Sequence, residues 1–99
     1  MSAHPTVPIR HDESSSRFIA EIDGHLAHAD YALEDVRMVF THTFVPPELR
    51  GRGLAEQLVR PALAHARERN LRVVPACSYV AAFITRHPEF TDLLPPSKV

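Results

Sequence analysis

A change in hydrophobic period, from about two residues before Pro46 to about 3.6 residues after Gly53, constrains the fold of this chain more than any other feature. The run of residues 36–45, VRMVFTHTFV, is rich in β-branched and aromatic side chains, which favour a strand. Beyond Gly53, apolar residues recur at the spacing of one helix face, at Leu54, Leu58, Ala62 and Ala66. The sequence therefore predicts a strand, a turn and a long helix in direct succession.

The turn between that strand and that helix has the composition of a phosphate-binding loop. Its residues and the first ones of the helix are Arg50, Gly51, Arg52, Gly53, Leu54 and Ala55. The two glycines let the backbone approach a ligand, and the N–H groups of a first helical turn lack intrahelical partners and lie at the positive end of the helix dipole. The two arginines add charge suited to phosphate oxygens. The spacing fits neither the Walker loop nor the dinucleotide fingerprint, and the alternative is a plain helix start with two solvated arginines.

Composition limits the classes of protein that this chain can belong to. Its 99 residues, 44% hydrophobic, suffice for one compact domain, expected at 7–94 between flexible tails at 1–6 and 95–99. The net charge of −1 gives no indication of a nucleic-acid or membrane partner. Neither a transmembrane run nor a signal peptide is evident, so we expect a cytoplasmic protein. Cys77 is the single cysteine and the histidines show no metal-ligand spacing, so neither a disulfide nor a metal site is expected.

Periodicity and turn residues along the rest of the chain predict an α+β fold. The expected strands are 7–11, 17–22, 25–32, 36–45 and 71–76, and the expected helices run from Gly53 to near Asn70 and over 78–86. Asp23-Gly24 is a hairpin turn, so the first half forms an antiparallel meander. The long helix links strand 36–45 to strand 71–76 as a crossover, which makes those two strands parallel neighbours. The sheet is therefore mixed and mostly antiparallel, with a central parallel pair.

Several separated motifs resemble those of the GNAT superfamily of N-acetyltransferases. Arg50-x-x-Gly53-x-Ala55 resembles the Q/R-x-x-G-x-G/A loop with which that superfamily holds the coenzyme A diphosphate. The motifs that look like its small single-domain YjdJ-type subgroup are Thr41-His42-Thr43, Gly51-Arg52-Gly53, Pro75-Ala76-Cys77-Ser78-Tyr79 and Arg86-His87-Pro88-Glu89-Phe90. The resemblance runs from about Val7 to Leu94. It implies a GNAT-like fold, splayed central parallel strands, two helices, and acetyl-CoA as cosubstrate without a metal.

The resemblance also implies where acetyl-CoA binds. The diphosphate would lie on the amides of Arg50–Ala55. The pantetheine arm would enter between the two splayed strands, where the residues expected beside it are Phe44 and Val45 on one side and Val74 and Pro75 on the other. The thioester would then point toward His42 and Cys77.

Three residues are candidates for the chemistry, each with a plainer alternative. His42 is either a proton acceptor or a packed histidine satisfied by backbone. Tyr79 resembles the tyrosine that protonates the departing thiolate in many GNAT enzymes, or it is an aromatic residue that covers the sheet edge. Cys77, next to a helix start that favours thiolate, is either a nucleophile or a residue that lines the tunnel. Residues 36–45 contain no carboxylate to act as base, which makes a covalent route through Cys77 plausible.

These observations predict an acetyl-CoA-binding protein, most simply an N-acetyltransferase that acts on an unidentified amine or protein. The alternatives are a coenzyme A or acyl-CoA binding module with little or no turnover, and a structural domain that keeps only the fold. The chain lacks the N-terminal helical segment that commonly shapes the acceptor side in GNAT domains. We therefore expect an acceptor groove that is open, or completed by a partner or by self-association.

Overall fold

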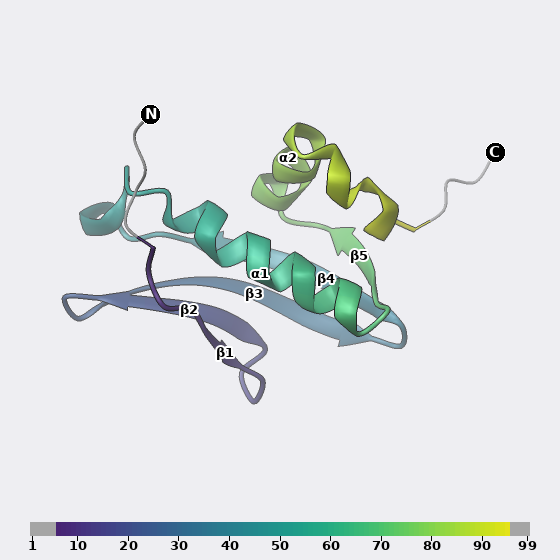
Figure 1. Ribbon diagram of the computed structural model, residues 1–99. Helices are drawn as coiled ribbons and strands as arrows, with labels where there is room; N and C mark the ends of the chain where they lie inside the picture. The colour runs from purple at the N-terminus through teal and green to yellow at the C-terminus, as the bar shows by residue number, and fades with distance from the viewer. Residues whose placement is uncertain (1–5, 96–99) are drawn as a thin grey trace.

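The computed structural model describes residues 6–95 and places them in one five-stranded sheet, two α-helices and two 3₁₀ helices (Figure 1). In chain order these are β1 (Arg10–Asp12), β2 (Arg17–Ile22), β3 (His25–Glu34), β4 (Arg37–Phe44), η1 (Pro47–Leu49), α1 (Leu54–Glu68), β5 (Arg72–Pro75), α2 (Ser78–Arg86) and η2 (Pro88–Leu93). Residues 1–5 and 96–99, which make up most of the expected tails, lie outside the described part of the chain.

The sheet has the expected mixed topology. Its strands lie in the order β1-β2-β3-β4-β5, with antiparallel pairs from β1 to β4 and a parallel pair between β4 and β5. The β2–β3 hairpin turns at Asp23 and Gly24, both with positive φ, as an Asp-Gly turn requires. Helix α1 makes the crossover from β4 to β5. The fold class predicted from the sequence is thus confirmed.

The first strand begins later than the sequence predicted, at Arg10 instead of Val7. The Val7 N–H donates to Gln57 Oε1 at 2.8 Å, and Pro8 has no N–H to donate. The N–H of residue 7 is therefore already bonded and that of residue 8 is missing, so neither can pair with a neighbouring strand. The third strand extends to Glu34, beyond the expected end at Ala32, whereas the fifth is limited to Arg72–Pro75.

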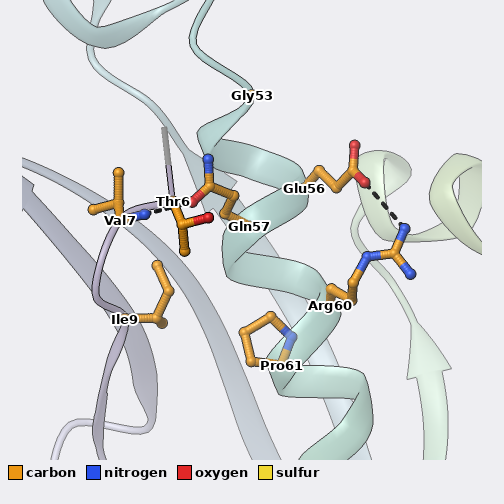
Figure 2. Close-up of a pocket in the computed structure, with 8 residues that line it drawn as sticks. All are labelled: Thr6, Val7, Ile9, Gly53, Glu56, Gln57, Arg60 and Pro61. Carbon is orange, nitrogen blue, oxygen red and sulfur yellow. Dashed lines mark hydrogen bonds and ion pairs between the residues drawn. The ribbon is translucent and has the colours of Figure 1, made fainter. Parts of the chain in front are cut away.

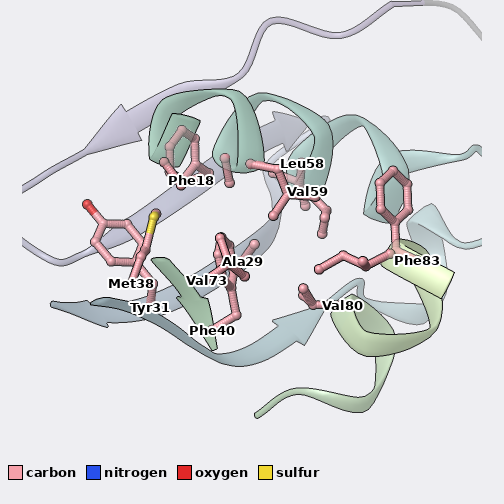
Figure 3. Close-up of a cluster of buried hydrophobic side chains, with 14 of the residues drawn as sticks. Phe18, Ala29, Tyr31, Met38, Phe40, Leu58, Val59, Val73, Val80 and Phe83 are labelled. Carbon is pink, nitrogen blue, oxygen red and sulfur yellow. The ribbon is translucent and has the colours of Figure 1, made fainter. Parts of the chain in front are cut away.

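One apolar core lies between the sheet and the helices (Figure 3). Helix α1 lies across one face of the sheet, and its buried residues are Leu54, Leu58, Val59, Ala62, Leu63 and Ala66. They pack with Phe18, Ala29 and Phe40 of the sheet and with Phe83 of α2. The end of α1 matches the expected cap, because Asn70 has φ 57° and the Leu71 N–H donates to the Ala66 carbonyl at 2.9 Å.

A β-bulge in β4 decides which side chains reach the site. Tyr31 pairs with Phe40 but Asp30 pairs with His42, which leaves Thr41 as an extra residue in β4. Because side chains alternate along a strand, the extra residue reverses the faces of those that follow. Thr43, opposite the buried Ala29, faces α1, whereas His42 faces the other side of the sheet.

The parallel pair separates beyond this bulge. Register pairs end at Phe40 and Pro75, and one further bond runs from the Cys77 N–H to the Phe40 carbonyl at 2.9 Å. Residues 41–44 continue β4 with no register partner in β5. The sheet therefore has a gap between the end of β4 and the start of α2. No helix within residues 6–95 crosses the sheet face opposite α1 (Figure 1).

Candidate functional site

The loop before α1 has the backbone geometry of an anion site. Gly51 has φ 81° and Gly53 has φ 70°, a left-handed conformation that L side chains rarely adopt. The Gln57 N–H donates to the Gly53 carbonyl at 3.2 Å, which closes the first turn of α1. The N–H groups of Leu54 and Ala55 precede that bond and have no intrahelical acceptor, and Gly53 supplies no side-chain cap. These donors remain free for a ligand at the positive end of the helix dipole.

A pocket of about 300 Å³ brings this loop together with Tyr79 of α2. Its lining residues are Val45, Leu49, Arg50, Gly51, Gly53, Leu54, Ala55, Glu56 and Tyr79. The pocket thus joins most of the sequence-predicted loop to a predicted catalytic side chain and to Val45, which follows the end of β4.

The two arginines of the loop take different positions. Arg50 lines the pocket, and its Nε donates to the Val45 carbonyl at 3.0 Å. Arg52 lies instead in a separate pocket beside Val7 and Ile22. A carboxylate, that of Glu56, also lines the loop pocket, and Arg60 Nη2 lies 3.0 Å from its Oε2. The backbone donors of the loop, with Arg50 beside them, therefore define the anion site.

Cys77 lies at the N-cap of α2, beside the gap. Its sulfur is half-buried and lies 3.5 Å from Thr43 Oγ1, within hydrogen-bonding distance for a thiol. Burial raises the pKa of the Cys77 thiol. Hydrogen bonds with the Thr43 side chain and with the backbone of Val80, Tyr79 and Thr43 outweigh that effect, so the pKa lies below its ordinary value. A lowered pKa increases the fraction of nucleophilic thiolate at neutral pH.

Tyr79 of α2 lines the loop pocket. Burial raises the pKa of its phenol above the ordinary value of 10.0, and Arg86 only partly offsets that effect. The phenol therefore stays protonated at neutral pH. Its ring centroid lies 6.2 Å from that of Phe83, which anchors the side chain to the core.

His42 is exposed and lies on the sheet face opposite Thr43, because of the bulge. Its ring centroid lies 6.4 Å from that of Phe44 on the same face. The structure therefore brings the Cys77 sulfur beside Thr43, with Tyr79 two residues further on in α2, whereas His42 lies on the other face of the sheet. Val74 and Pro75 pair with Val39 and Phe40 at the last rungs of the parallel ladder.

A larger groove of about 460 Å³ lies elsewhere, between residues 6–9 and α1 (Figure 2). Its lining residues are Thr6, Val7, Ile9, Gly53, Glu56, Gln57, Arg60 and Pro61. It contains neither Cys77 nor Tyr79, and the polar side chains that α1 contributes are engaged in the Val7–Gln57 and Glu56–Arg60 contacts. Of the candidate catalytic residues, Tyr79 lines the smaller pocket, whereas Cys77 lies at the N-cap of α2 beside the gap.

Comparisons with known proteins show the family of this chain. The family described as GCN5-related N-acetyl-transferase matches residues 17–93, which is most of the chain. The chain belongs to the GCN5-related N-acetyltransferase family. Acetyl-CoA is the cosubstrate of this family, so membership indicates acetyl transfer from acetyl-CoA.

Relatives within the family cover nearly the whole chain. Protein NATD1 of Bos taurus is 32% identical over 95 residues, which are 91% of this chain and 84% of its own. Protein NATD1 of Gallus gallus is 31% identical over 85 residues, which are 83% of this chain and 77% of its own. A GCN5-like protein from Staphylococcus aureus, solved by NMR in solution, is similar with a TM-score of 0.73 and 25% identity, over 94% of this chain and 92% of its own.

This family member also has a polar cluster that the sequence did not reveal, far from the loop along the chain. Potential metal-ligand atoms of His11, Glu13 and His65 all lie within 4.8 Å of one another. The guanidinium of Arg69 lies 3.9 Å from the Glu13 carboxylate, and the His11 ring hydrogen bonds to the hydroxyl of Tyr31. Burial, and then the charge of His65, lower the pKa of His11. His11 therefore favours its neutral form and packs as part of the β1–α1 contact.

A second arrangement missed from the sequence is nearer to the gap. His28 and Asp30, two residues apart on β3, point to the same face as His42 and contact each other at 2.8 Å. Their i, i+2 spacing places them on one face of a strand, which the sequence does show. Their position beside the end of β4 depends on the strand register and on the bulge, and the sequence shows neither of these.

Proposed function

We propose that this protein is an acetyl-CoA-dependent N-acetyltransferase of the YjdJ-type subgroup, with residues 7–94 as its single catalytic unit, acting on an amine or protein acceptor in the cytoplasm. The observation that carries the proposal is the pocket in which the free N–H groups at the start of α1 and the Tyr79 side chain lie together. A diphosphate needs several converging N–H donors, and a thioester needs a proton donor for the departing thiolate.

The coenzyme would lie along the pocket and the gap. Its diphosphate would accept hydrogen bonds from the amides of Gly53, Leu54 and Ala55, with Arg50 beside it. The pantetheine arm would follow the unpaired end of β4 at Phe44 and Val45. Arg50 Nε now donates to the Val45 carbonyl, and a pantetheine amide would replace that bond while Arg50 turns to the phosphates.

The acetyl group would pass through Cys77. The thiolate attacks the thioester carbonyl, the bond between that carbon and the coenzyme sulfur breaks, and the coenzyme thiolate takes a proton from Tyr79 or water. An amine then attacks acetyl-Cys77, expels the Cys77 thiolate and loses one proton. The sequence suggests His42, which lies on the open face, as the group that accepts that proton.

Two measurements test the proposal. Calorimetry with acetyl-CoA establishes binding, and a screen of amines and lysine peptides for coenzyme A release establishes turnover. Binding without any turnover would support a coenzyme A binding module instead, and no binding would leave only the fold in common with the family.

Intact-mass spectrometry after brief incubation with acetyl-CoA tests the covalent route. We expect an acetyl adduct on Cys77 that chases onto an amine. A Cys77→Ala variant with undiminished transfer would eliminate that route and leave direct transfer, with Cys77 as part of the wall.

A further inference from the structure

The sheet face opposite α1 holds a histidine with a fixed orientation beside the end of β4. His28 Nδ1 lies 2.8 Å from Asp30 Oδ1, and the two side chains are only 18% and 20% exposed. An ionised carboxylate can only accept hydrogen bonds, so Nδ1 carries the proton and Nε2 of the neutral ring keeps a lone pair. Among residues 6–95, no group forms a hydrogen bond with that Nε2.

Arg17 holds the carboxylate from the neighbouring strand β2. Its Nε lies 3.2 Å from Asp30 Oδ1 and its Nη2 lies 3.3 Å from Oδ2. The Nε atom is buried without a well-aligned hydrogen bond, so its contact with Asp30 is essentially ionic. The Thr41 hydroxyl also donates to the Asp30 carbonyl at 3.3 Å, which ties the bulge to the same residue. Asp30 is therefore held at both its side chain and its backbone.

His28 lies beside the end of β4, next to the gap. Its register partner is Phe44, the last residue of β4, and the two ring centroids lie 5.6 Å apart. The ring of His42 lies 6.3 Å away on the same face. Because β4 has no β5 partner after Phe40, this group of rings adjoins the gap on the face that no helix covers.

We propose that His28 is the proton acceptor for the incoming amine, with Asp30 and Arg17 as its positioning residues; this inference rests on the proposed acetyltransferase function. The amine approaches from the open face, opposite Cys77, and its nitrogen forms a bond to the acetyl carbonyl carbon. One N–H proton passes to His28 Nε2, and the bond between the acetyl carbon and the Cys77 sulfur breaks to release the Cys77 thiolate. His28 then passes its proton to solvent, and solvent replaces the proton that Tyr79 or water gave to the departing coenzyme thiolate, so the protons balance.

His28 is better placed for this role than His42. A base works best when another group fixes its orientation, as Asp30 does for His28. His42 has no hydrogen bond to any described side chain and makes ring contacts alone. The other charged and titratable groups on this face near His28 are Arg10 and Asp12 on β1, Arg17 and Glu21 on β2, and His42 on β4.

Steady-state kinetics with acetyl-CoA and butylamine, a plain primary amine, test the assignment. His28→Ala should lower kcat/KM by about 10²-fold, the usual effect of a general base, while the Kd for coenzyme A stays within about twofold of the wild type. Added imidazole should restore part of the rate, and the acid limb of the pH–rate profile should disappear. His25→Ala, at a half-buried histidine of the same strand, is the matched control and should behave as the wild type.

Several outcomes would overturn the inference. They are a His28→Ala variant at the wild-type rate, a loss that imidazole does not restore, and a loss confined to His42→Gln. If the wild type binds no acetyl-CoA, or binds it without acetylating any amine, the proposed function fails instead. Nitrogen-15 spectra of the histidine rings then still test the hydrogen bond between His28 and Asp30. The His28 ring should carry its proton on Nδ1 in the wild type, and its tautomer distribution should change in Asp30→Asn. A wild-type ring protonated on Nε2 alone would contradict it.

Discussion

Replacement of Gly53 by aspartate or by asparagine separates the electrostatics of the loop from its shape. Gly53 has φ 70°, and Asn and Asp tolerate this conformation better than other side chains do. Asp23, Asp35 and Asn70 already adopt φ between 52° and 60° in this chain. A negative charge at a helix N-terminus also stabilises the helix by about 0.3–1 kcal/mol. Both variants should therefore fold, with unfolding free energies within about 1 kcal/mol of each other.

Binding of coenzyme A should distinguish the two variants sharply. A carboxylate about 4 Å from a phosphate charge is repelled by about 1 kcal/mol in bulk water and by about 4 kcal/mol at the effective dielectric near a protein surface. The Gly53→Asp variant should therefore bind coenzyme A at least about tenfold more weakly than Gly53→Asn, which is about 1.4 kcal/mol. Because exposed charges are screened, the difference should shrink at high salt.

Calorimetric titration of coenzyme A into both variants and the wild type, at low and high salt, measures these differences, and thermal unfolding checks the fold. Wild-type affinity in both variants would show that the diphosphate does not lie at the start of α1. An equal loss in both, independent of salt, would show that the side chain acts by its bulk alone.

Three further results are expected. Burial raises and the Thr43 hydrogen bond lowers the pKa of Cys77, so Thr43→Val should shift the alkylation–pH midpoint of Cys77 upward; an unchanged midpoint would show that Thr43 has no influence on the thiolate. Leu58 is a fully buried residue of α1, so Leu58→Ala should lower the free energy of unfolding measured in urea by about 2–5 kcal/mol. A loss below about 1 kcal/mol would contradict that packing. Burial, and then His65, hold the pKa of His11 below its unfolded value of 6.5, so the unfolded chain takes up more protons and stability should fall as pH drops through 6.5. The His11→Asn variant should lose part of that pH dependence, and an unaltered slope would assign it to other groups.

Local patterns predicted much of this fold. Alternation predicted β2 at Arg17–Ile22, and the apolar spacing predicted α2 at Ser78–Arg86, with the observed bounds. The positive φ of Gly51 and Gly53 agrees with the loop predicted from their spacing. Such features depend on neighbouring residues, so they can be inferred from one sequence.

The features that the sequence did not predict depend on contacts between distant residues. The bulge at Thr41 turns His42 away from Cys77, and bulges have no firm single-sequence signal. Likewise, Arg52 points away from the loop pocket, although its place in the motif suggested a partnership with Arg50. Registers and side-chain directions of this kind are set by packing rather than by local pattern.

We propose that coenzyme A binds with its diphosphate at the start of α1 and its pantetheine arm in the gap beside Cys77. An amide-resolved NMR titration of the nitrogen-15-labelled protein with coenzyme A tests it most directly. The largest shifts are expected at Gly51, Gly53, Leu54 and Ala55, with a second group at Cys77 and its neighbours in α2. Shifts confined to the groove at residues 6–9 and the outer side of α1, or no shifts at millimolar coenzyme A, would contradict the account.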